Sequence, residues 1–185
     1  MLLDIAFLDD ATRPTVPKLV GLRDDQREAG EHLKQVHDHL RDNMRTIRAL
    51  IQRAADGLAT PAEVAAQTGD LTIVTNFRRF GNLCGQHCQI VNAHHSIEDA
   101  HLFPALAARS ERYARVTERL AAEHVVVHEL LLRQIDTLNA LATTPTAATF
   151  ADAREVYDAL ERVLASHLRY EEEQIGDALG YFGIF

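Results

Sequence analysis

The chain has 185 residues, 46% of them hydrophobic, which is enough for one domain with a sizeable core. Its formal net charge of −8 argues against nucleic acid and anionic membrane surfaces as partners, because those partners need clustered Lys and Arg. No apolar run approaches the roughly 20 residues that cross a bilayer. The first residues carry no basic signal-peptide segment, so we expect a cytoplasmic protein.

Residues 1–21 predict an N-terminal arm, because Pro14 and Pro17 exclude a continuous helix there. The first long helix is expected from about Leu22, where an apolar stripe at helical spacing begins. Its end is expected near Gly57, because glycine suits the residue after a helix.

A short helix and a second long helix are expected next. Thr60–Glu63 has the pattern of a capping box with proline at the first helical position, which predicts the short helix. The second long helix is expected from about Leu71 to His101 or Phe103, with Pro104 at or beyond its end.

Two further long helices complete the predicted fold. They are expected over Glu111–Leu141 and Ala148–Leu179, with a loop at Thr143–Thr146 between them. No segment has a convincing strand pattern. The sequence therefore predicts an all-α, up-down-up-down four-helix bundle over residues 22–180, followed by an apolar C-terminal tail at 181–185.

Histidines and glutamates recur four residues apart on three of the expected long helices. The pairs are His94 and Glu98, His124 and His128, and His167 and Glu171. Residues four apart lie on the same helix face, so each pair can point into the bundle together. Buried polar groups of this kind are costly unless they coordinate a metal, and the pattern therefore indicates a metal site inside the bundle.

The two halves of the chain carry a faint repeat, which predicts two similar helical hairpins whose histidines meet. Residues from His37 onward align with residues from His128 onward. The first helix offers three candidate ligands, His37, His32 and His39, and the repeat favours His37.

Several neighbouring side chains have a structural interpretation. We expect Cys84 and Cys88 to be buried free thiols, with a redox or metal-binding role as the alternative. His87 lies seven residues before His94 and is either an extra ligand or a packed core residue, which we favour. His95 points about 100° away from His94 on an ideal helix, and we expect it to take no part in the site.

The stretch His94–Pro104, ending in Leu-Phe-Pro, resembles the second-helix signature of the hemerythrin-like family of HHE cation-binding proteins. The resemblance covers roughly residues 25–180, and the three spaced pairs arrive in the family's order.

The resemblance implies a ligand set of five histidines and two carboxylates. These are His37, His94, Glu98, His124, His128, His167 and Glu171. One ion would take the last three histidines, and the other would take the first two and keep an open position. Glu98 and Glu171 would bridge the ions. Spacing on the fourth helix leaves Glu172 as an alternative bridge, and the internal match to His94 and Glu98 favours Glu171.

The same resemblance implies a non-haem di-iron centre, with two Fe ions joined by an oxo or hydroxo bridge. Its expected small-molecule ligand is O2 or H2O2, bound at the open iron position for oxygen binding, storage or sensing. The alternatives are an enzyme that decomposes hydrogen peroxide, or iron handling. Five neutral imidazoles and few carboxylates argue against monooxygenase activity. The sequence leaves a monomer or a homodimer equally open.

Overall fold

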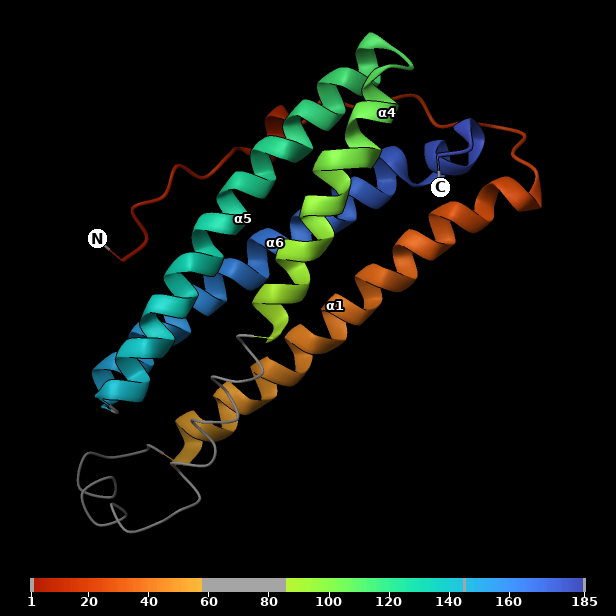
Figure 1. The fold of residues 1–185 in the computed structure, drawn as a ribbon. Helices are drawn as coiled ribbons and strands as arrows, with labels where there is room; N and C mark the ends of the chain where they lie inside the picture. Colours follow the sequence, from red (N-terminus) through yellow and green to blue (C-terminus); the bar gives the residue numbers. More distant parts are fainter. Residues whose placement is uncertain (1, 58–85, 145, 185) are drawn as a thin grey trace.

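The computed structural model describes residues 2–57, 86–144 and 146–184, which are helical apart from the N-terminal arm and short links. The elements are η1 (Asp10–Thr12), α1 (Asp24–Gly57), a helical run over residues 86–97 that continues through η2 (Glu98–Leu102) into α4 (Phe103–Ala107), α5 (Glu111–Thr143) and α6 (Ala147–Phe182). Successive long helices run in opposite directions (Figure 1). The prediction of an all-α four-helix bundle is confirmed.

The second long helix continues past Pro104, which corrects the predicted end at His101 or Phe103. Residues Glu98–Leu102 form a π turn, closed by a hydrogen bond that the Phe103 N–H donates to the Glu98 carbonyl. Proline has no N–H, and its ring collides with the preceding turn of a regular α-helix. We attribute the continuation to the wider π turn, which lets the helix continue to Ala107.

The last helix also runs beyond its predicted end at Leu179. It ends at Phe182, before Gly183, which has the left-handed backbone (φ 64°) that favours glycine. Phe182 packs edge-on against Tyr113 with ring centroids 5.5 Å apart. Residues 181 and 182 are therefore part of the helix, and this end covers one apolar cluster. The predicted short helix after Thr60 and the side chain of Cys84 lie outside the described residues.

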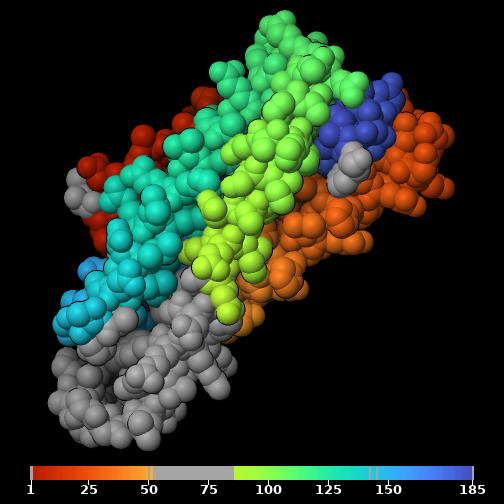
Figure 2. Space-filling model, viewed as in Figure 1, coloured from red at the N-terminus to blue at the C-terminus, as the bar shows by residue number. Residues whose placement is uncertain are grey.

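The N-terminal arm lies along α5 and α6 and does not extend into solvent (Figures 1 and 2). Arg133 on α5 donates to the carbonyl of Leu2 at 3.0 Å, and the Val16 N–H donates to Gln174 on α6 at 2.9 Å. The arm is therefore attached to the bundle near both of its ends.

The described core has three apolar clusters, and a polar layer lies between two of them. On α1, Leu33 belongs to one apolar cluster and Leu40 to the other, and His37 lies between them. The same order holds on α5, where Leu120 and Val127 flank His124. Within the described ranges, no helix is long and apolar enough to cross a membrane.

Candidate metal centre

The polar layer consists of two adjacent groups of potential metal ligands. The first group is His95, His124 and His167, and the second is His37, His94, Glu98 and Glu171. Within each group the ligand atoms lie within 4.8 Å of one another. All four long helices of the bundle contribute to the two groups. Every member is buried except the half-buried His94.

The two glutamates lie between the groups. Glu98 Oε1 is 3.2 Å from His94 Nε2, and Glu98 Oε2 is 3.7 Å from His124 Nε2. Glu171 Oε2 is 3.5 Å from His37 Nε2 and 3.6 Å from His167 Nε2. Each carboxylate therefore reaches imidazoles of both groups, which is the disposition that a bridging ligand needs.

Three of the imidazoles are oriented by an outer carboxylate at Nδ1. The pairs are His37 with Glu172 at 2.8 Å, His124 with Asp99 at 2.9 Å, and His167 with Glu123 at 3.0 Å. A carboxylate accepts from the ring N–H, so it fixes the tautomer that carries the proton on Nδ1. Nε2 then keeps its lone pair and points to the centre, as in metal sites where a carboxylate supports a ligating histidine.

This arrangement places lone pairs against each other unless a cation is bound. His124 Nε2 and His167 Nε2 lie 3.1 Å apart, and both rings carry their proton on Nδ1. Burial, reinforced by His167, lowers the pKa of His124 to about 2, so this ring is neutral at physiological pH. His37 Nε2 lies 3.1 Å from His94 Nε2, and burial lowers the pKa of His94 to about 3, so the His94 ring is also neutral at physiological pH.

The glutamates also lack the hydrogen bonds that buried carboxylates need. Apart from each other, Glu98 and Glu171 have no hydrogen-bond partner for their carboxylate oxygens among the described residues. Burial and the neighbouring Glu171 raise the pKa of Glu98 well above its usual range. Cations between these oxygens and the imidazole lone pairs would satisfy both sets, so the residues fit a metal centre. Mixed imidazole and carboxylate ligation suits iron, manganese, cobalt or zinc better than calcium or magnesium.

The structure brings six of the seven sequence-predicted ligands together. They are His37, His94, Glu98, His124, His167 and Glu171. His128 lies just outside both groups, with its ring 5.8 Å from that of His95 and its buried Nε2 without a partner in the described chain. Glu171 takes the central position, and Glu172 takes the outer one.

The structure places His95 in the first ligand group, although the sequence analysis expected it to take no part in the site. It is fully buried, its ring stacks on His124 at 3.8 Å, and neither of its nitrogens has a partner among the described residues. His94 and His95 belong to different groups. The rotation of about 100° between adjacent residues is what allows one helix to supply both groups.

The remaining candidates lie away from the centre. His32 and His39 are exposed on α1. His87 is buried but belongs to neither ligand group. Cys88 is a free, buried thiol, and burial raises its pKa to about 11, in agreement with a structural role.

Sequence reasoning missed the outer carboxylates Asp99 and Glu123. A signal for them exists, since each is the immediate neighbour of a predicted ligand, and Glu172 follows the same rule. Hydrogen bonds from His167, Arg13 and Arg119 outweigh the burial of Glu123 and lower its pKa to about 2. Glu123 is therefore an ionised acceptor.

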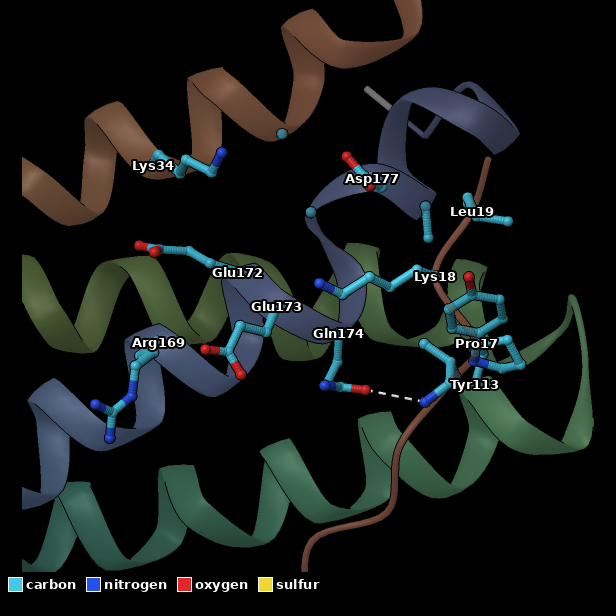
Figure 3. A pocket seen from close by; sticks show the side chains of 14 residues that line it. Pro17, Lys18, Leu19, Lys34, Tyr113, Arg169, Glu172, Glu173, Gln174 and Asp177 are labelled. Atoms are coloured by element: carbon cyan, nitrogen blue, oxygen red, sulfur yellow. Dashed lines mark hydrogen bonds between the residues drawn. The ribbon is translucent and has the colours of Figure 1, made fainter. Parts of the chain in front are cut away.

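A cleft of about 530 Å³ between the arm, α1 and α6 extends to the edge of the centre (Figure 3). Glu172 lines this cleft, and the same carboxylate binds His37 Nδ1 and Arg41. Figure 3 shows Glu172 reaching from α6 towards α1, where Lys34 lies. One side chain therefore connects the cleft with a ligand of the second group.

A comparison with protein families gives one match, to the model described as hemerythrin HHE cation binding domain, over residues 29–179. No curated protein matches the chain, and no solved structure matches it. The matched residues span α1 to α6 and include every member of both ligand groups.

Proposed function

The chain belongs to the family of hemerythrin HHE cation-binding domains, and on that premise we propose that its centre holds two iron ions and binds dioxygen or hydrogen peroxide. The observation that carries the proposal is the pair of buried carboxylates, each within 3.7 Å of imidazoles from both ligand groups. When bound, two iron ions exchange electrons with small oxygen species, chemistry that protein side chains alone do not supply.

The two ligand groups differ in a way that supports a small-molecule ligand at one ion. The first group offers three imidazoles, whereas the second offers two imidazoles besides the shared carboxylates. His94, in the second group, has 12% of its side chain exposed, and Glu98 beside it has 2%. We infer that a ligand as small as O2 or H2O2 reaches the centre on the His94 side.

Reversible binding is the function we favour. Apolar side chains enclose the polar layer on both sides and exclude water from it, including Leu33, Leu40, Leu120 and Val127. A dry site limits the proton transfers that would convert a bound oxygen species further.

Decomposition of hydrogen peroxide is the second candidate, and the Glu172–His37 hydrogen bond favours it. Peroxide turnover requires protons, and this 2.8 Å bond connects the centre to a carboxylate in the solvent-filled cleft. Glu172 would take the proton of His37 Nδ1 at Oε1 and return it, so that this pair holds one exchangeable proton at the edge of the centre.

Purified protein reconstituted with ferrous iron tests the proposal. We expect two iron atoms per chain and a visible absorption band that changes on exposure to air. Hydrogen peroxide is then added and the evolved O2 is measured with an electrode. A stable, reversible spectral change without turnover supports a carrier or sensor, and turnover far above that of free iron supports the enzyme. Iron uptake without either response contradicts both functions.

A further inference from the structure

Among the residues that the structure describes, the carboxylate that orients His167 has no counterpart in the other half of the bundle. The two halves otherwise match, because Asp99 follows Glu98 and Glu172 follows Glu171. Asp99 and Glu172 each orient one imidazole of the opposite hairpin. Glu123 is different, since it lies immediately before a ligand on α5 and orients a ligand on α6.

Glu123 is held by a residue from outside the bundle. Arg13, on the N-terminal arm, donates from Nε to Glu123 Oε1 at 2.8 Å and from Nη2 to Oε2 at 3.0 Å. Arg119 adds a bond to Oε1 at 2.7 Å, one turn before Glu123 on α5. Together with His167 Nδ1, four donors surround this buried carboxylate. A planar guanidinium that contacts both oxygens fixes the plane of the carboxylate as well as its charge.

The arm positions Arg13 through several further contacts. Arg13 Nη1 donates to Ser166 Oγ at 2.9 Å, and its guanidinium lies 4.6 Å from the centre of the Tyr170 ring. The Tyr170 hydroxyl donates to the carbonyl of Pro14, the next residue of the arm, at 2.7 Å. Arg119 donates to Thr12 at 2.8 Å. The arm segment around Arg13 is therefore fixed against α5 and α6 next to the ligand His167.

We propose that the N-terminal arm completes the metal centre, with Arg13 as a positioning residue that holds Glu123 in the plane that orients the His167 ring. The inference rests on the proposed function only in requiring that the centre holds two ions. It assigns Arg13 an effect on one ligand group, His95, His124 and His167, and none on the group that contains His37 and His94. It also explains why a polar arm residue lies in a layer that the four helices otherwise build alone.

The test is a cobalt(II) titration of the full-length chain, followed by its visible spectrum and by competition with a chelator. Removal of an outer hydrogen-bond partner of a metal ligand weakens metal binding about 10- to 100-fold. Arg13 acts through Glu123, which Arg119 also holds, so we expect Arg13→Gln to weaken one cobalt ion by about 10-fold, the lower end of this range, and to change its spectrum, while the other ion keeps its affinity. Arg13→Lys should recover only part of the affinity, because an ammonium cannot contact both oxygens in one plane.

Arg133→Gln is the matched control. Arg133 donates to the carbonyls of Leu2 and Asp4, so this variant loosens the arm without touching Glu123. We expect it to keep both cobalt affinities. A double-mutant cycle adds Glu123→Gln, and Arg13→Gln should cause no further loss in that background.

Three results would overturn the proposal: wild-type affinities in Arg13→Gln, equal weakening of both ions, or the same weakening in Arg133→Gln. A wild-type chain that takes up fewer than two ions contradicts the proposed function instead.

In that case the effect of Arg13 on the His167 ring is tested on the metal-free protein by ¹H–¹⁵N spectra of the histidine rings. Arg13→Gln should alter the Nδ1–H signal of His167 and leave that of His37 in place. An unchanged His167 signal would also overturn the proposal.

Discussion

Adjacent histidines on one helix contribute to different ligand groups. His95 stacks on His124, whereas His94 faces His37 across the bundle. His128, one turn after His124, ends 5.8 Å from His95 without a partner for its Nε2 in the described chain. The first ligand group therefore has His95 as its third member, and His128 lies just outside it.

We predict that His95→Ala loses one of the two metal ions. His128→Ala should also weaken metal binding, but less, because its ring lies farther from His124 and His167. Metal analysis after dialysis against a weak chelator measures both. Full loading of His95→Ala, or a larger loss in His128→Ala, would contradict this ranking.

His87 gives a prediction on pH and stability. Its side chain is 1% exposed, and burial, helped by His39, lowers its pKa to about 4 from 6.5. The unfolded chain therefore binds this proton more readily, so the contribution of His87 to stability is present above pH 6.5 and is lost as the pH falls towards 4. The full shift corresponds to about 3 kcal/mol.

We expect His87→Met to remove the part of the pH dependence that His87 contributes, while the other buried histidines keep theirs. Urea unfolding of the metal-free protein at pH 7.5 and at pH 4.5 would show a smaller loss of stability in the variant than in the wild type. His101→Met, at an exposed position, is the control and should follow the wild type. Parallel losses in wild type and His87→Met would exclude the assigned role of burial.

At the scale of the helices, α1 and α6 pack closely at a pair of glycines, Gly30 and Gly176. A Cβ added at Gly30 would lie 2.9 Å from the carbonyl oxygen of Gly176, whereas a Cβ added at Gly176 would meet only Gly30 Cα at 3.8 Å. The contact lies two turns from His37 on α1 and brings the helix that carries it against the helix that carries His167 and Glu171.

The same substitution should therefore have opposite effects at the two glycines. Alanine is favoured over glycine within a helix by about 1 kcal/mol. At Gly30 the collision with backbone outweighs this gain, and we expect Gly30→Ala to lower the free energy of unfolding by about 2 kcal/mol. Gly176→Ala should leave it unchanged or raise it. Equal effects in chemical denaturation would show that the close approach is absent.

Helix positions were predictable because apolar spacing and end signals are local. The departures have local physical causes: the π turn carries the second helix past Pro104, and α6 continues to the left-handed Gly183. Five of the six predicted residues that meet in the polar layer followed from the spacing of four residues, and His37 followed from the internal repeat. His95 did not, because the sequence argument allowed one inward face per helix, whereas His94 and His95 point from one helix into two adjacent groups of potential ligands. Arg13 gave no sequence signal, since it meets Glu123 across 110 residues.

At the scale of the whole molecule, the polar layer is costly to the fold without metal. Glu98 and Glu171 are buried and close to each other, and apart from each other they have no hydrogen-bond partner among the described residues. Burying such groups costs free energy that bound cations offset. Stability and metal binding are therefore linked in this chain.

We predict that chelation lowers the melting temperature, and that Glu98→Gln raises the melting temperature of the metal-free protein. The amide is neutral at every pH, so it avoids the free-energy cost of charging or protonating a buried carboxyl group, while it removes a ligand for both ions. In calorimetry, the difference in melting temperature between the metal-loaded and the metal-free protein should then be smaller than in the wild type. Glu173→Gln, at an exposed position on α6, is the control and should keep the full difference. A metal-free wild type as stable as the loaded protein would contradict the link.

An anomalous-scattering map from crystals of the iron-loaded chain tests most directly whether the polar layer holds two iron ions. We expect two iron peaks in this layer, one beside His95, His124 and His167 and one beside His37 and His94, with Glu98 and Glu171 between them. A map without iron peaks in this layer, or with the ions on exposed histidines such as His32 and His39, would contradict this expectation.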